Sequence, residues 1–257
     1  MSEFFGFGGY QRMPEGYMSW QHLLFVTSLM AVMLLAAAFL GRRNRALCEK
    51  EKNKILICMA ILIDLLELFK IVLICFRNHN PMSWLYDLPL FLCSIQLIAI
   101  PIAAFSKGRL REAALDFVLI FGCLGAVLGT YGAGQNYGTY PVLSFDNVIS
   151  GLTHSISGFC SLYIAFSGLT SLKKKNVGFC FAILLGFCGT AFIVNHLIDY
   201  NYMFLRAGDG TPYDILYNFV GGSPVLYPLG VIAMFLAYIC VFYLGRYLFL
   251  KRKDKCR

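Results

Sequence analysis

The sequence predicts an all-α membrane protein: a polytopic bundle of seven transmembrane helices, with the N-terminus outside and the C-terminus in the cytoplasm. Composition is the first observation, because 58% of the 257 residues are hydrophobic, only 14% are charged, and the mean hydropathy is +0.66. These values lie outside the range of soluble globular domains. The second observation is that apolar runs of about 20 residues, the length needed to cross a bilayer, recur along the chain. The third is an uneven distribution of Lys and Arg.

Only short polar connections separate the apolar runs, so we expect residues 1–257 to form a single transmembrane bundle. The seven predicted helices comprise residues 20–40, 55–76, 84–105, 113–133, 148–169, 177–198 and 225–249. The first helix is expected to remain as an anchor, because its cationic cluster follows the apolar run instead of preceding it. A short apolar stretch in the last outer loop, Tyr213 to Val220, is expected to be interfacial or re-entrant.

The basic residues predict the orientation, since short cytoplasmic loops retain Lys and Arg. Eighteen of the 22 Lys and Arg residues lie after the first, third and fifth helices and at the C-terminal end. These positions share one side of the membrane only if the number of spans is odd. We therefore expect a multi-pass protein of the cell membrane with its N-terminus outside. Because the clusters lie between apolar runs and form no soluble basic face, a nucleic-acid partner is not expected.

The ten Cys residues do not predict a metal site or a disulfide framework. Most of them lie inside apolar runs, and neither a C-x-x-C nor an H-E-x-x-H spacing occurs in the sequence. These are the spacings expected of zinc ligands and metalloproteases. We therefore expect no metal and no soluble cofactor.

Polar side chains interrupt several predicted helices and are functional candidates, because ionisable groups at membrane depth are costly. Asp64, Glu67 and Lys70 follow one another at i,i+3 spacing on the second helix, where Glu67 and Lys70 could simply neutralise each other. Cys93 and Gln96 lie three residues apart on the third helix. The remaining candidates are His22, His154, Asn195, His196, Asn201 and Tyr202.

On the predicted topology these residues fall in the outer half of the membrane or near its centre, and the inner halves are nearly free of ionisable groups. We therefore expect a polar pocket that opens toward the outer side. A thiol, an imidazole and amide groups in one water-poor pocket are the components of acyl transfer. Each also has a structural interpretation: packing for Cys93, a buried hydrogen bond for His154, and backbone binding at a helix end for Asn195.

Three segments carry a resemblance to a known family: LPLFLCSIQ at residues 88–96, THS at 153–155 and VNHLIDYNYMFL at 194–205. The chain resembles the YwaF family of bacterial integral membrane proteins, which is similar to the animal transmembrane protein 164 family. The resemblance implies a bacterial plasma membrane. Members of the animal branch are described as acyltransferases that move a fatty acyl chain between phospholipids with a Cys nucleophile and a His partner. The resemblance thus implies Cys93 as nucleophile and His154 as base.

The leading hypothesis is a lipid-modifying acyltransferase or acyl hydrolase that acts on phospholipid-type esters, with membrane lipids or lipid-like molecules as its partners. Asn195 or Gln96 would donate a hydrogen bond to the oxyanion. The alternative is a transporter or ligand-binding membrane protein that uses the Asp64, Glu67 and Lys70 site for a proton or solute. A third possibility is a scaffold whose polar residues only hold the bundle together. The sequence leaves the oligomeric state open.

Overall fold

The structure, a computed structural model, describes residues 2–170 and 172–255, and helices are the only regular secondary structure of these residues. Its longer helices are α2 (Trp20–Arg43), α3 (Glu49–Arg77), α4 (Gln96–Phe105), α5 (Gly108–Tyr131), α7 (Phe145–Ser167), α8 (Val177–Ile198) and α10 (Leu226–Lys255). The short elements are α1 (Ser2–Phe5), η1 (Pro81–Tyr86), α6 (Gly134–Thr139), η2 (Lys174–Asn176), η3 (Tyr202–Phe204) and α9 (Tyr213–Phe219).

Five helices, α2, α5, α7, α8 and α10, are long and apolar enough to cross a membrane. This confirms the predicted all-helical, multi-pass membrane protein. Two other helices differ from these five. The 29 residues of α3 are long enough to span, at roughly 1.5 Å per residue, but its centre carries Asp64, Glu67 and Lys70. The ten residues of α4 reach only about 15 Å.

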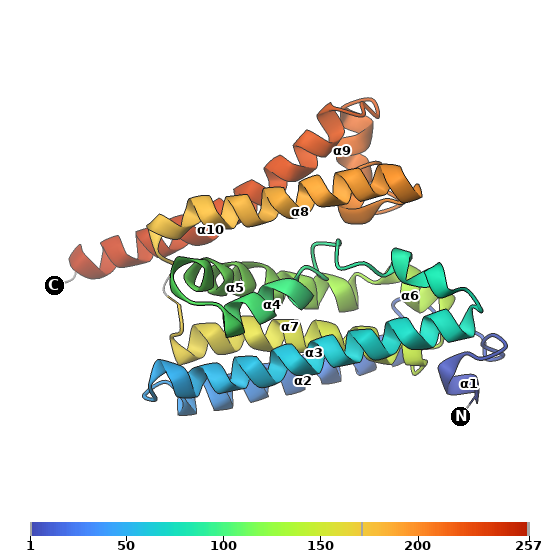
Figure 1. The fold of residues 1–257 in the computed structure, drawn as a ribbon, viewed down its shortest axis with the longest axis horizontal. Helices are drawn as coiled ribbons and strands as arrows, with labels where there is room; N and C mark the ends of the chain where they lie inside the picture. Colours follow the sequence, from blue (N-terminus) through green and yellow to red (C-terminus); the bar gives the residue numbers. More distant parts are fainter. Residues whose placement is uncertain (1, 171, 256–257) are drawn as a thin grey trace.

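The helices form three layers around α5 (Figure 1). The hairpin of α8 and α10 lies on one side of α4 and α5, and α2, α3 and α7 lie on the other. The connections from α2 to α3, α4 to α5 and α7 to α8 lie together with the C-terminal end of α10, and we call this end of the bundle the basic end. The N-terminus, α6 and α9 lie at the opposite end.

The third predicted helix, residues 84–105, is not continuous. Its first part is the 3₁₀ element η1, its second part is α4, and residues 87–95 between them are turns. Pro89 explains the break, because proline has no backbone N–H and disfavours helical backbone at the preceding Leu88. Local hydrogen bonds replace the helical ones here: the Phe91 N–H donates to Ser94 Oγ at 3.0 Å. The helix therefore restarts only at Gln96.

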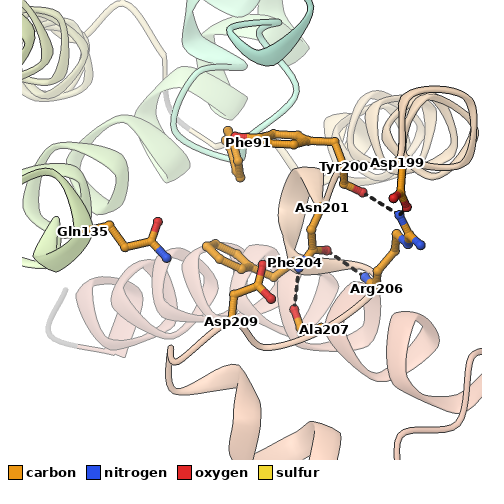
Figure 2. A pocket seen from close by; sticks show the side chains of 9 residues that line it. All are labelled: Phe91, Gln135, Asp199, Tyr200, Asn201, Phe204, Arg206, Ala207 and Asp209. Atoms are coloured by element: carbon orange, nitrogen blue, oxygen red, sulfur yellow. Dashed lines mark hydrogen bonds and ion pairs between the residues drawn. The ribbon is translucent and has the colours of Figure 1, made fainter. Parts of the chain in front are cut away.

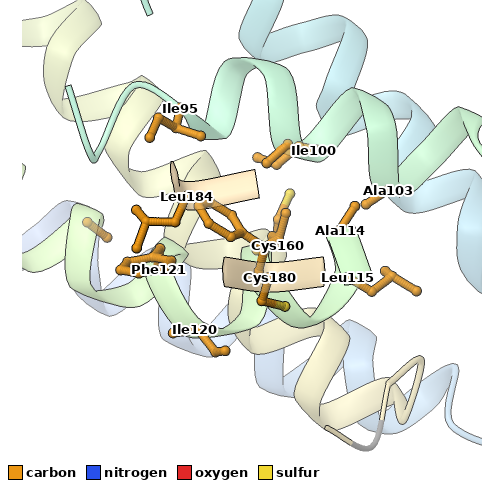
Figure 3. Close-up of a cluster of buried hydrophobic side chains, with 14 of the residues drawn as sticks. Ile95, Ile100, Ala103, Ala114, Leu115, Ile120, Phe121, Cys160, Cys180 and Leu184 are labelled. Carbon is orange, nitrogen blue, oxygen red and sulfur yellow. The ribbon is translucent and has the colours of Figure 1, made fainter. Parts of the chain in front are cut away.

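The core of the bundle is apolar and lies where α4, α5, α7 and α8 meet (Figure 3). Small residues bring α5 and α7 close together: a methyl group at Gly122 would lie 2.7 Å from the Ser157 carbonyl oxygen. Lipid supplies little hydrophobic driving force between helices, so close packing at small residues is a main source of helix association in membranes. Since 67% of its apolar window is buried, α5 is the central helix of the fold.

Candidate functional site

Two glycines of α5 place Cys93 and His154 next to each other along one helix face. A methyl group at Gly125 would come 3.3 Å from both Cα and Cβ of Cys93, and one at Gly129 would overlap the His154 ring. Residues four apart in a helix are stacked one above the other, about 6 Å apart along the axis. Cys93, which precedes α4, and His154 of α7 therefore pack against consecutive turns of α5 and are neighbours.

Both reactive groups are half-buried and lack a strong partner in the described part of the chain. None of the hydrogen bonds of the described residues joins the Cys93 sulfur to the His154 ring or occupies either nitrogen of that ring. The backbone N–H groups of Cys93 and Ser94 face the Cys93 sulfur just before α4 begins. Backbone N–H groups in this position can donate hydrogen bonds to an oxyanion.

An ion triad attaches the segment that carries Cys93 to α3. The Lys70 ammonium lies 2.6 Å from Glu67 Oε1 and 3.0 Å from Asp87 Oδ1. It also interacts electrostatically with Cys93 and His154. The predicted Glu67–Lys70 pair is thus present, and Asp87 is a third member that the helical spacing of α3 did not predict. Glu67 and Lys70 are therefore on the Cys93 side of the bundle, whereas the Asp64 side chain, also predicted for this site, is exposed.

Tyr202 fastens the same segment from the other side. Its hydroxyl donates to the Leu85 carbonyl oxygen at 2.5 Å and accepts the Leu88 N–H at 3.1 Å. Asn195 in turn fixes Tyr202: its Nδ2 donates to the Tyr202 carbonyl oxygen at 3.0 Å, and its Oδ1 accepts the Tyr202 N–H at 2.6 Å. The Asn195 amide is fully used in holding the backbone, as the structural interpretation of this residue predicted.

Gln96 is as buried as Asn195, but its side-chain amide makes no hydrogen bond to the described residues. Its side chain is 1% exposed, and neither Nε2 nor Oε1 has a hydrogen-bond partner among the described residues. A buried amide without partners costs about 1–3 kcal/mol. The Gln96 N–H donates to the Cys93 carbonyl oxygen at 3.5 Å, so a single turn of backbone joins the two residues.

Figure 2 shows a cavity of about 520 Å³. It is lined largely by the segment between α8 and α9, which lies at the end of the bundle opposite the basic end (Figure 1). Aromatic and charged side chains share its wall: Phe91, Gln135, Asp199, Tyr200, Asn201, Phe204, Arg206, Ala207 and Asp209. The Arg206 guanidinium donates to Asp199 Oδ1 at 2.6 Å. Asn201 Nδ2 donates to Asp209 Oδ2 at 2.7 Å. Phe91, two residues before Cys93, belongs to this wall, whereas Cys93 and His154 do not line the cavity.

The two remaining predicted histidines are not at this site. His22 is fully buried: its Nδ1 accepts the Met18 N–H and its Nε2 lies 3.2 Å from the Thr130 carbonyl oxygen. This pattern requires the proton on Nε2 and joins α2 to α5. His196 is exposed, and its Nδ1 bonds to the Phe192 carbonyl oxygen one turn earlier in its own helix.

A buried salt bridge closes the end of the bundle opposite the basic end. Arg77 donates to Asp146 through two nitrogens, at 2.6 and 2.9 Å, and to the Phe5 carbonyl oxygen at 3.3 Å. Tyr10 donates to the same carboxylate. Burial, followed by the hydrogen bond from its hydroxyl to Asp146, raises the pKa of Tyr10 to about 12, so the phenol remains a donor. The N-terminal segment is thus tied to the ends of α3 and α7.

The expectation that the inner halves are nearly free of ionisable groups needs a correction. Asp116 of α5 is completely buried near the basic end. Asn176 Nδ2 and the Tyr243 hydroxyl donate to its Oδ2 at 2.8 and 2.9 Å, and Thr170 donates to its Oδ1. These donors come from the α7–α8 connection and α10, far away in sequence, so nothing in the hydrophobic pattern of α5 predicted them.

The described part of the chain has no cluster of three or more His, Cys, Asp or Glu residues able to hold a metal ion. A family model described as the TMEM164 family matches residues 17–244. No curated protein and no solved structure matches the chain. The matched region contains α2 to α9, most of α10, and each residue of the candidate site. The chain therefore belongs to the TMEM164 family.

Proposed function

We propose that the protein is an integral membrane enzyme, an acyltransferase or acyl hydrolase, that acts on phospholipid-type esters. One observation carries the proposal: Cys93 and His154 pack against Gly125 and Gly129, which lie one turn apart on α5. A thiol nucleophile requires a base beside it. Membrane lipids are the partners that such a site would meet.

In the first half of the reaction, the Cys93 thiol gives its proton to His154 and the sulfur attacks the ester carbonyl carbon. The carbon–sulfur bond forms, and the tetrahedral intermediate carries the negative charge on its oxygen. The intermediate collapses to a thioester, and His154 returns the proton to the departing alcohol oxygen. This sequence is general acid–base catalysis by one imidazole. Water or an acceptor alcohol then releases the acyl group.

Gln96, and not Asn195, is the side-chain donor that we assign to the oxyanion. The Asn195 amide is engaged with the Tyr202 backbone, whereas the buried Gln96 Nε2 has no partner among the described residues. The N–H groups of Cys93 and Ser94 complete the set of donors. Donors that are already oriented toward developing charge are usually the largest electrostatic contribution to acyl transfer.

The cavity beside Phe91 supports a phospholipid-type substrate. Its wall combines the Arg206 guanidinium with the Asp209 carboxylate and the rings of Tyr200 and Phe204. Guanidinium groups recognise phosphate, and aromatic faces with carboxylates attract ammonium groups. A lipid headgroup in this cavity would leave its glycerol esters on the side of Cys93.

For the topology, we infer seven crossings, with η1, residues 87–95 and α4 together forming the third, and with the N-terminus outside. The gathering of the basic loops at one end of the bundle, with the N-terminus at the other, supports this arrangement. The similarity to the bacterial YwaF family supports a bacterial plasma membrane. Reporter fusions after residues 47, 106, 172 and 255 are expected to report a cytoplasmic position, and a periplasmic signal at any of them would contradict it.

The catalytic assignment is tested by measuring acyl exchange between phospholipids in proteoliposomes. Cys93→Ala and His154→Ala are each expected to reduce the rate by about 10⁶-fold, the loss known for the nucleophile or the base of an acyl-transfer triad. Cys58→Ala, at an exposed position of α3, is the matched control and is expected to retain the full rate. Full activity of both site variants would overturn the mechanism.

A further inference from the structure

A groove of about 430 Å³ lies at the basic end of the bundle, between the last turns of α10 and the α7–α8 connection. Its wall is apolar except for one guanidinium, and it consists of Leu172, Val241, Phe242, Gly245, Arg246 and Phe249. None of the residues proposed for acyl transfer lines it. The groove is therefore a second site, separate from the one around Cys93.

The buried Asp116 carboxylate holds the two sides of this groove together. It accepts hydrogen bonds from Tyr243 of α10 at 2.9 Å and from Asn176 of the connection at 2.8 Å. Thr170, which also belongs to the connection, donates to the same carboxylate. Leu172 lies between two of these donors in the chain, so the hydrogen bonds fix it beside α10. The groove is thus built by the fold.

Gly245 leaves the floor of the groove open. A methyl group at Gly245 would meet no atom within 4 Å, whereas one at Gly122 would lie 2.7 Å from a carbonyl oxygen of α7. Close helix packing therefore explains Gly122 but not Gly245. Val241 and Phe249 lie one turn before and one turn after Gly245 and are both exposed, so the three residues form one apolar stripe. This stripe is open to an apolar chain from the membrane.

Arg246 places a positive charge beside the apolar stripe. The apolar span of α10 ends at Phe249, so Arg246 lies about one turn inside that end, near the level of the lipid headgroups. Its guanidinium lies 5.9 Å from the centre of the Phe249 ring. Guanidinium groups bind phosphate through two parallel hydrogen bonds. The groove therefore combines a phosphate-binding group with a surface for an acyl chain.

The α7–α8 connection adds positive charge next to the groove. Three lysines follow Leu172 directly, and Lys173 and Lys175 both pair with Glu112 at 2.8 Å. Lys174 between them is exposed and has no ion pair among the described residues. Basic residues at a membrane surface attract anionic phospholipids, and basic pockets at the cytoplasmic side bind their headgroups. The charge next to the groove thus favours an anionic lipid over a zwitterionic one.

We propose that this groove binds an anionic phospholipid of the inner leaflet, with the phosphate at Arg246 and one acyl chain along Gly245. The inference uses the orientation inferred above, in which the basic end is cytoplasmic, and it does not depend on the proposed reaction. The bound lipid fastens α10 to the α7–α8 connection from the membrane side. It complements the hydrogen bonds of Asp116 on the buried side of α10.

Photoactivatable lipids test the site in proteoliposomes of the full-length protein. The membrane is dioleoyl phosphatidylcholine, and the probe is phosphatidylglycerol or phosphatidylcholine with a diazirine on one acyl chain. Mass spectrometry of peptides locates the crosslinks. The phosphatidylglycerol probe is expected to label residues 241–249 about fivefold more than the phosphatidylcholine probe, and Arg246→Gln is expected to remove this preference. One basic residue at an anionic membrane surface contributes a factor of about five.

Two pairs of variants make each outcome decisive. Gly245→Leu fills the groove and is expected to abolish the preference, whereas Gly186→Leu, where a Cβ also meets nothing within 4 Å, is expected to retain it. Arg43→Gln removes the same charge as Arg246→Gln from an exposed position at the basic end of α2, and it is also expected to retain the preference. Equal labelling by the two probes, or a preference that survives in both groove variants, would overturn the proposal. Equal losses in Arg43→Gln and Arg246→Gln would overturn it as well, because the attraction would then belong to the whole basic end.

Discussion

Two buried polar regions of this bundle differ in how completely their hydrogen bonds are made. Near the basic end, the Asp116 carboxylate accepts from three donors of distant segments and is inaccessible. Around Cys93, by contrast, the thiol, the imidazole and the Gln96 amide lack side-chain hydrogen-bond partners among the described residues. Fully satisfied polar groups specify structure, whereas unsatisfied ones at one place call for a ligand. Burial alone therefore does not distinguish a structural polar group from a functional one.

Removal of the unpartnered Gln96 amide is expected to have the largest effect on the difference between these two regions. Gln96→Leu is expected to lower kcat for acyl exchange by about 10²–10³-fold, because one oxyanion donor is lost. Stability is expected to stay equal or to rise, since a buried amide without a described partner is replaced by an apolar group. Kinetics in proteoliposomes and thermal unfolding in detergent measure both. Asn195→Ala is the matched amide variant, and it is expected to lower stability more than kcat. A reversed pattern would show that Gln96 is structural.

The glycine face of α5 offers the second test. In Gly129→Ala the new methyl group would overlap the His154 ring, so the imidazole must move. A displacement of about 1 Å in a catalytic group reduces the rate by roughly 100-fold. Gly186→Ala on α8 is the control, because a Cβ at that position meets nothing within 4 Å. Unchanged exchange by the Gly129 variant would mean that His154 does not act on the substrate.

The hydrogen-bonded region around Asp116 is tested by the effect of a substitution on stability. Asp116→Ala leaves the Asn176, Thr170 and Tyr243 donors unpaired and is expected to cost about 1–3 kcal/mol of unfolding free energy. The exchange rate per folded molecule is expected to remain that of the unaltered protein. Thermal unfolding followed by size-exclusion chromatography measures the first quantity, and proteoliposome assays the second. A selective loss of activity without loss of stability would place Asp116 in the functional machinery.

The smallest effect is expected at His196. This histidine is exposed and bonds only to its own helix, so His196→Ala is expected to change neither exchange rate nor melting temperature beyond error. The same assays check it. A loss comparable with that of His154→Ala would mean that the site includes the exposed face of α8 that carries His196.

Much of the fold was predictable, because hydrophobic length and charge act along the chain. The sixth predicted helix, residues 177–198, has the bounds of α8, and the others except the third differ from the structure mainly at their ends. The third predicted helix was wrong because the apolar composition of residues 84–105 does not by itself show the effect of Pro89. It also does not show that the Asp87 side chain pairs with Lys70. In that segment, local turn chemistry and one ion pair outweighed hydrophobicity.

The amino-acid order is enough to identify which segments are apolar enough to enter a membrane and which polar residues they carry, because both properties belong to single stretches of chain. What these residues do depends on the tertiary structure. It directed the Asn195 amide to the Tyr202 backbone, left Gln96 without a described partner, and placed Cys93 and His154 against adjacent glycines. Hydrogen-bond satisfaction depends on neighbours from other helices, and no single helix pattern contains that information.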